Sequence, residues 1–375
     1  MATAYTPGLT VTARTTHRVR RLLPIRGDVL VKEGDVVAAQ DIVAQTFMPG
    51  DITPVNVANV LSLPPGDVAE CMLRTTGDSL SVGDPIARTK GIFGMLKNTC
   101  TAKVAGTLES ISSVTGQIMI RGEPEPVRVR AYLSGKVMKV LPGEGVEIET
   151  DVSLIQGIFG IGGETYGRIV MACDSHDQEF TADLVKPVMK DCVIVGGARM
   201  TGKAIARARE IGAAAIVTGG LDDEDLRDFL GYDLGVAITG SEDVGITLII
   251  TEGFGEIAMA ERTFELLGSR AGADASVNGA TQIRAGVMRP EILIPLTEES
   301  RAKAPAKGRH DGQLTRGRPV RIIRDPFFGL IGTVGKLPPE PQVLGSGSRA
   351  RVLEVKLDSG DSVVIPRANV ELIEG

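Results

Sequence analysis

The chain of 375 residues has a formal net charge of −6 at pH 7, and 43% of its residues are hydrophobic. This length exceeds what one hydrophobic core usually supports, so we expect two or three domains. No run of about 18 consecutive apolar residues occurs, which argues against a membrane-spanning helix. The four cysteines lie far apart and form no C-x-x-C pair. That spacing argues against disulfides and zinc sites, and it predicts a cytoplasmic protein.

The first 26 residues are basic and contain no acidic side chain. Pro7, Gly8 and Pro24 interrupt any amphipathic helix in this segment. A basic N-terminal arm over residues 1–26 is therefore preferred to the alternative, a targeting peptide. The arginines of the segment are Arg14, Arg18, Arg20, Arg21 and Arg26.

Residues 27–190 predict short strands joined by tight turns, because brief apolar runs alternate with Gly-Asp turns. The stretch GKVMKVLPGEGVEIETDVSLI (135–155) resembles the strands of the barrel-sandwich hybrid found in biotinyl and lipoyl carrier domains. The resemblance implies this fold for the domain. It does not imply carrier function, because Lys139 falls inside an expected strand and not at an exposed hairpin tip. The residues that carry the resemblance are Gly135, Val137, Val140, Gly143 or Gly145, Val146 and Leu154.

The segment CDSHDQE contains four side chains that could bind a metal ion. They are Cys173, His176, Asp177 and Glu179. Spacings this tight also occur in solvated loops, and the chain has only three histidines. We therefore interpret the segment as a loop and predict neither a metal site nor a cofactor.

In residues 191–300 the apolar residues are spaced differently from those of residues 27–190. The apolar runs CVIVGG, AAAIVTGG, GVAITG and ITLIITEG alternate with helical stretches such as GKAIARAREIGA and DDEDLRDFLG. Continuous apolar strands separated by helices predict an open parallel α/β domain of the Rossmann type. Ligands of such sheets bind beyond the carboxyl ends of the strands, so the residues after each run form the candidate ligand site.

The first of these runs leads into a P-loop-like sequence, Gly197-x-x-x-x-Gly202-Lys203. A nucleotide-binding P-loop also needs a Ser or Thr at the next position to hold magnesium, and that position is Ala204. Glu252 is the only carboxylate well placed to substitute for it. Gly197, Gly202, Lys203 and Glu252 are kept as an alternative anion or nucleotide site. A turn that only packs a strand against a helix is preferred.

The sequence predicts no catalytic constellation. His17, His176 and His310 lie in three different segments, and none stands beside a nucleophile motif. Glu252 and Glu256 could form an acid/base pair at the mouth of the sheet. A role for Glu256 at the start of the following helix is preferred, because a carboxylate there interacts favourably with the helix dipole.

Residues 301–316 are rich in basic residues, Pro and Gly, and predict a basic linker. Residues 317–375 resemble a KOW domain, the small SH3-like barrel of NusG-type transcription elongation factors and of some ribosomal proteins. Short alternating strands with Gly turns independently predict a small closed barrel. The resemblance is carried by V-R-I-I at 320–323, P-F-F-G at 326–329, G-T-V at 332–334, and the strands RVLEVKL and SVVIP.

KOW domains bind RNA or protein, and the resemblance implies the same choice here. The near-neutral charge of residues 317–375 favours a protein partner, with a weak nucleic-acid contribution from the basic linker. The chain has no Trp, and only 3% of its residues are aromatic, too few for an extensive base-stacking platform. The predicted partner-binding residues are Arg318, Arg321, Arg324, Phe327 and Phe328.

We therefore expect a multidomain α/β plus β protein with a barrel-sandwich hybrid at 27–190, a parallel α/β domain at 191–300 and a KOW barrel at 317–375. The primary hypothesis is a non-catalytic cytoplasmic adaptor or scaffold that contacts the transcription or translation machinery through its KOW barrel. The alternative is an enzyme or sensor that binds a phosphorylated ligand in the α/β domain. The second alternative is a self-assembling structural protein that forms homo-oligomers.

Overall fold

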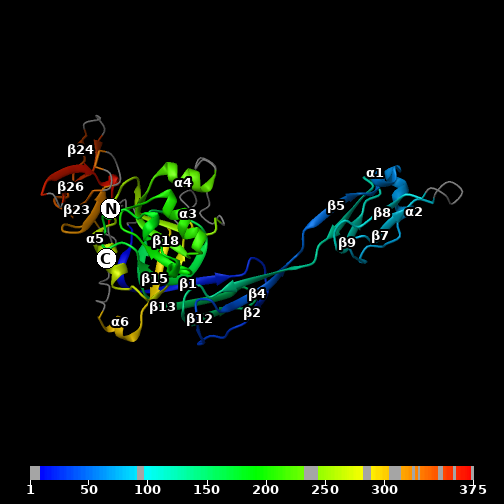
Figure 1. Ribbon diagram of the computed structural model, residues 1–375, viewed down its shortest axis with the longest axis horizontal. Coiled ribbons are helices and arrows are strands. Elements are labelled where there is room, and N and C mark those ends of the chain that lie inside the picture. The colour runs from blue at the N-terminus through cyan, green and yellow to red at the C-terminus, as the bar shows by residue number, and fades with distance from the viewer. Residues whose placement is uncertain are drawn as a thin grey trace.

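The computed structural model of the protein is strand-rich, with several sheets and few helices. Figure 1 shows an elongated molecule, with a broad body at one end and a narrow β lobe at the other. No helix in the described part of the chain has the length and apolar character needed to cross a lipid bilayer. The described residues are 9–90, 97–231, 244–281, 289–303, 314–322, 326–327, 330–344, 349–357 and 360–372.

A sheet of 12 strands forms the body. Four of its strands, β15, β16, β18 and β19, run parallel to one another, and the strands that flank them are antiparallel. In spatial order the sheet consists of β14 (Phe159–Ile161), β19 (Thr247–Phe254), β18 (Ala215–Leu221), β16 (Cys192–Val195), β15 (Glu164–Met171), β20 (Asp274–Asn278), β21 (Glu291–Pro295), β13 (Gly145–Gln156), β12 (Gly135–Leu141) and β3 (Val36–Val37). Outside this path, β1 (Val11–Leu22) pairs with β13, and β17 (Arg199–Met200) pairs with β18.

The parallel strands include those predicted from the sequence. The runs CVIVGG, AAAIVTGG and ITLIITEG correspond to β16, β18 and β19, which are buried along most of their length. The fourth run, GVAITG at 235–240, lies outside the described residues. Ile194 and Ile216 pack into one apolar cluster and Val193 and Val217 into another, so both faces of the sheet are covered. The helices that follow these strands are α3 (Gly202–Ile211), α4 (Asp223–Leu230) and α5 (Glu261–Gly268), and α6 (Glu298–Lys303) comes later in the chain.

The longest pairing in the body joins β1 to β13 over almost their whole length. One half of β13 also pairs with β12, and its other half pairs with β21. A single strand therefore belongs both to the α/β part of the sheet and to the small β unit beside it. The segment expected to be a basic arm contributes a sheet strand from Val11 onward.

Cross-strand charge pairing explains why a basic segment is held in the sheet. The register places Arg18 opposite Glu149 and Arg20 opposite Glu147. In each pair a guanidinium nitrogen lies 2.8 Å from a carboxylate oxygen. Both arginines are more than half exposed, so these pairs select the register and contribute little free energy of folding.

Strands from two distant stretches of the chain pack around a small apolar core beside the β1–β13 pair, and this β unit is called the barrel below. A three-stranded sheet is formed by β11 (Glu125–Arg130), β4 (Ile42–Met48) and β2 (Asp28–Val29), and it faces β3, β12 and β13. Lys139 lies within β12, as expected. The buried core of the barrel consists of Val37, Val43, Ala131, Val137, Val146 and Ile148.

The part of the chain between β4 and β11 forms the separate lobe of Figure 1. Residues 27–190 therefore do not share one core, because residues 52–121 enclose a second one. At the neck, a Cβ atom at Gly50 would overlap the main-chain oxygen of Gly122, so glycine lets the two connecting segments approach closely. The lobe consists of β5 (Ile52–Asn56), α1 (Val57–Leu61), α2 (Val68–Cys71), β6 (Ser79–Leu80), β7 (Pro85–Arg88), β8 (Thr99–Thr101), β9 (Gly106–Ile111) and β10 (Gln117–Arg121).

The described strands between Pro319 and Leu372 form a five-stranded antiparallel sheet at the end of the molecule opposite the lobe (Figure 1). The strands expected over RVLEVKL and SVVIP are β26 (Val352–Leu357) and β27 (Ser362–Pro366). Val320, Val334, Leu353 and Val355 are buried in the core of this unit. The order of the sheet is β27, β26, β23 (Ile331–Val334), β22 (Pro319–Ile322) and β28 (Val370–Leu372), and β24 (Gln342–Val343) pairs with β25 (Arg349–Ala350) beside it.

Separate cores predict separate unfolding of the lobe. Ile118 is fully buried in the lobe and Ile216 is fully buried in the body. Replacing Ile118 by Ala removes buried methyl groups and leaves a cavity, which costs about 2–5 kcal/mol. We expect Ile118→Ala to lower the hydrogen-exchange protection of lobe amides and to leave β16 and β18 protected, and Ile216→Ala to do the reverse. Equal loss of protection throughout the chain in either variant would show that lobe and body unfold as one unit.

Candidate functional site

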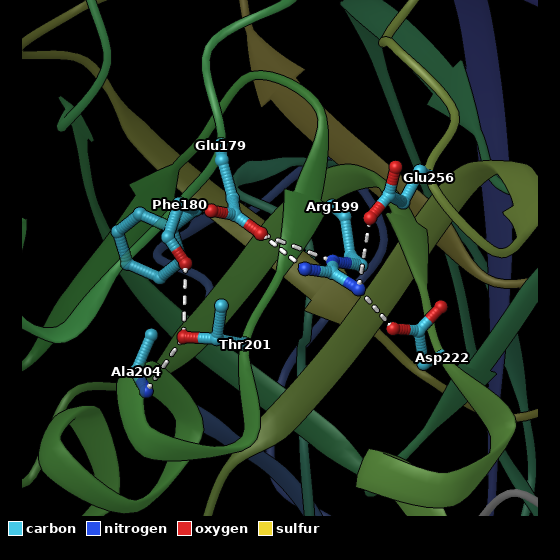
Figure 2. A network of polar contacts seen from close by, with 7 residues as sticks. All are labelled: Glu179, Phe180, Arg199, Thr201, Ala204, Asp222 and Glu256. Carbon is cyan, nitrogen blue, oxygen red and sulfur yellow. Dashed lines mark hydrogen bonds and ion pairs between the residues drawn. The ribbon is translucent and has the colours of Figure 1, made fainter.

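The carboxyl ends of the parallel strands meet at one arginine. Arg199 lies on β17, just after β16, and Figure 2 shows its guanidinium between Glu179 on one side and Asp222 and Glu256 on the other. These carboxylates come from the chain after β15, β18 and β19 respectively. The segments that follow four neighbouring strands are therefore tied to a single cation.

The contacts of Arg199 are short and highly charged. Its Nε donates to Oε1 of Glu179 at 3.1 Å, and its Nη1 lies 3.3 Å from Oε1 of Glu256. Its guanidinium also pairs closely with Asp222. The hydrogen bonds to Glu179 and Asp222 raise the pKa of Arg199 above its ordinary value, so this side chain keeps its charge. Three carboxylates around one cation leave this edge of the sheet negative, which disfavours phosphate.

The first glycine of the P-loop-like sequence has a packing role. A Cβ atom at Gly197 would overlap the main-chain oxygen of Ser175 and lie 2.6 Å from that of Gln178. The neighbouring Ala198 donates its N–H to the Gln178 oxygen at 2.7 Å. Glycine is needed here because the loop after β15 lies directly against it.

The start of α3 is satisfied within the chain. The hydroxyl of Thr201 accepts a hydrogen bond from the Ala204 N–H at 3.3 Å, which is an N-cap contact. A Cβ atom at Gly202 would lie 2.7 Å from the Asp225 carboxylate, so negative charge lies close to the helix start. Lys203 is exposed. The structure therefore does not bring the predicted P-loop residues together as a phosphate cradle.

Glu252 and Arg321, which the sequence assigned to two different sites, form one buried ion pair. Their side chains are 3% and 4% exposed, and a guanidinium nitrogen of Arg321 contacts Oε2 of Glu252. Arg321 also donates through Nη1 to the main-chain oxygen of Thr251 at 3.2 Å. The other oxygen of Glu252 accepts the Ala260 N–H at 3.0 Å. The pair docks the C-terminal sheet on the end of β19.

The remaining predicted partner-binding residues are placed as follows. Phe327 packs against the core of the C-terminal sheet, and Arg318 is half-buried. Arg324 and Phe328 lie outside the described residues. Since Arg321 is engaged within the chain, the predicted face is partly occupied by the body of the protein.

The segment CDSHDQE is a connected loop. Nδ1 of His176 lies 2.8 Å from the main-chain oxygen of Met259, Asp177 accepts a hydrogen bond from the Ser175 hydroxyl at 2.6 Å, and Glu179 contacts Arg199. Within the described ranges, no three His, Cys, Asp or Glu side chains gather closely enough to hold a metal ion.

The proposed helix role of Glu256 is wrong. The helix that follows it, α5, begins at Glu261, so Glu256 lies outside the first helical turn and pairs with Arg199 instead. Glu252 does not face it as a catalytic partner, because Glu252 is engaged by Arg321. The signal that could have revealed Arg199 is its place directly after a predicted strand end, where ligands and polar networks of α/β sheets gather.

A carboxyl with a shifted pKa lies at the other end of the body, where β15 begins. Glu291 accepts a hydrogen bond from the Tyr132 hydroxyl at 3.4 Å. Burial, reinforced by the nearby charge of Glu164, raises the pKa of Glu291 to about 7, although the bond from Tyr132 lowers it. Burial also raises the pKa of Tyr132. Tyr132 therefore stays neutral near pH 7, and Glu291 exchanges its proton in the same pH range.

A comparison with protein-family models and with curated proteins finds no match to this chain.

The buried Glu252–Arg321 pair predicts a large loss of stability when one partner is removed. In Arg321→Ala the Glu252 carboxylate stays buried without its cation, and we expect the free energy of unfolding in urea to fall by about 3–5 kcal/mol. The exposed Arg207–Glu210 pair provides the control, since Arg207→Ala should cost less than about 1 kcal/mol. The double variant Arg321→Met, Glu252→Leu should recover most of the loss. Equal effects of Arg321→Ala and Arg207→Ala would contradict the buried pairing.

The raised pKa of Glu291 predicts that stability depends on pH. The folded-state value of about 7 exceeds the ordinary value of 4.5, so the folded protein binds this proton more tightly than the unfolded chain does. The resulting stabilisation is present below pH about 4.5 and is lost as the pH rises through about 7, by up to about 3 kcal/mol. Glu291→Gln should therefore gain stability relative to wild type between pH 5 and 8 in urea titrations. The exposed control Glu33→Gln should follow wild type, and a parallel curve for Glu291→Gln would refute the assignment.

Proposed function

We propose that the protein is a non-catalytic scaffold that binds a protein or ribonucleoprotein partner through its C-terminal unit. The observation that carries the proposal is the arrangement in Figure 1: two small β units, each with its own core, lie at opposite ends of an elongated body. Small units displayed in this way are accessible to partners, whereas the mouth of the parallel strands is filled by the Arg199 network.

The proposal includes the finer fold assignments from the sequence. The antiparallel order β27-β26-β23-β22-β28 supports the resemblance of the C-terminal unit to a KOW barrel. The turns and short strands around β2, β4, β11, β12 and β13 support a barrel-sandwich hybrid, and the parallel strands with α3 and α4 support a Rossmann-like unit. On this assignment the partner belongs to the transcription or translation machinery, as KOW resemblance implies.

The docking surface proposed here avoids the side that holds Arg321. Val343 on β24 is 65% exposed and Val364 on the edge strand β27 is 59% exposed. Exposed apolar side chains at a sheet edge are suited to contact another protein. The near-neutral charge of residues 317–375 also favours protein over nucleic acid.

The two alternatives have less support. A nucleotide enzyme or sensor at Gly197 and Lys203 would place phosphate near the Glu179, Asp222 and Glu256 carboxylates, which repel it. Self-assembly of the chain would use the same edge strand as partner binding. Light scattering of the purified protein distinguishes a monomer from such an assembly.

Two charged substitutions on the C-terminal unit test the scaffold proposal. Tagged full-length protein is compared with two double variants. One carries Val343→Asp and Val364→Asp in the C-terminal unit, and the matched control carries Val82→Asp and Val114→Asp in the lobe. The two control sites are 68% and 85% exposed. We expect the C-terminal variant alone to lose its partner in affinity purification, because a buried carboxylate at an interface is costly. Loss of the partner at high salt would indicate an ionic contact, and retention would indicate an apolar contact with a protein. An identical partner set for all three proteins would refute docking through this unit.

A further inference from the structure

A cleft rich in arginine lies where the barrel meets the α/β part of the body. Its volume is about 720 Å³, which falls within the range of small-molecule sites. Its walls come from four segments: the end of β1, the loop before β4, the strand β11 with Tyr132 after it, and the start of β15. The residues that line it include Arg20, Arg21, Arg128, Arg130, Tyr132 and Glu164.

Two of the four arginines are held by carboxylates. Arg21 forms a bidentate pair with Glu164, with both N–O distances 2.6 Å, and its Nε donates to the Arg130 main-chain oxygen at 2.8 Å. Its guanidinium carbon also lies 5.3 Å from the centre of the Tyr132 ring. Arg20 pairs with Glu147 at 2.8 Å. These contacts fix the wall of the cleft.

The other two arginines supply uncompensated charge. Arg128 and Arg130 alternate along β11 with Val127 and Val129, and Val129 packs into the barrel core, so the arginines lie on the opposite, exposed face. Among the residues that the structure describes, no carboxylate lies within ion-pair distance of either guanidinium. Two adjacent cations without partners repel each other, and an anion between them removes that repulsion.

We infer that this cleft binds a small anion that carries two or more phosphate groups. The planar guanidinium donates paired hydrogen bonds to phosphate oxygens, and Arg128 and Arg130 offer two such donors side by side. The volume accommodates a phosphorylated molecule of nucleotide size and not a nucleic-acid helix. The cleft is separate from the Arg199 network and from the C-terminal docking surface, so its occupancy is independent of the scaffold proposal.

A neighbouring hollow shows that the charge is specific to this cleft. A second cavity of about 520 Å³ shares Glu164, Thr165 and Tyr166 with it, but its other lining residues include Asp191 and no Lys or Arg. Phosphate is therefore attracted to the arginine side of Tyr166 and repelled from the other side.

The test is a calorimetric titration of the full-length protein with inorganic tripolyphosphate. We expect one saturable site, and Arg128→Ala, Arg130→Ala should weaken its affinity at least about tenfold, because each variant position loses a charged hydrogen bond. Both side chains are exposed and lack ion pairs among the described residues, so the variant should fold. The control Arg26→Ala, Arg207→Ala removes the same charge from sites outside the cleft and should change the affinity less than about twofold.

Two further ligands decide the chemical class. Citrate carries a similar charge on carboxylates, and a single-stranded RNA carries phosphates on an extended chain. Weaker binding of citrate than of tripolyphosphate supports the inference. Equal losses in the cleft and control variants, absence of tripolyphosphate binding, or binding of RNA alone would each overturn it.

Discussion

The antiparallel pairing of β1 with β13 is the contact on which the architecture depends. Because β13 continues from the barrel into the 12-stranded sheet, main-chain hydrogen bonds and not a linker join these two parts. Their relative orientation is therefore fixed by backbone geometry. The arginine cleft follows from this, since one of its walls belongs to the barrel and another to the start of β15.

The two edges of the parallel strands differ in charge. At the carboxyl ends, three acidic side chains surround Arg199. At the start of β15, four arginines line a cleft with a single carboxylate. Ligands of open α/β sheets usually bind at the carboxyl ends of strands, but electrostatics here favour anions at the other side. The barrel brings the additional arginines, so the sheet alone would not have this property.

Local sequence patterns were sufficient to predict those strands whose residues are apolar or alternate along the chain. Continuous apolar runs predicted β16, β18 and β19, and alternation predicted β26 and β27. The strand character of β1 was not predicted, because its acidic partners on β13 lie more than a hundred residues away. The separate core of the lobe was missed for the same reason, since short strands and Gly turns look alike in both β units.

Contacts between distant residues were also missed at the candidate sites. Glu252 was identified as a motif substitute and Arg321 as a surface cation, although the two form one buried pair. Neither burial nor an ion pair between residues about seventy positions apart leaves a periodic trace in the sequence. Arg199 was overlooked because an arginine after a strand is common, and only the folded sheet shows three carboxylates around it.

The buried pair of Glu252 and Arg321 fixes the position of the C-terminal unit more than it strengthens its attachment to the body. Removing two charges from water costs nearly as much as their attraction returns, so such a pair adds little net adhesion. Its hydrogen bonds to Thr251 and Ala260 nevertheless permit one arrangement of the C-terminal unit. The buried pair therefore sets one orientation of the C-terminal unit on the body, and with it the direction in which the exposed Val343 and Val364 face.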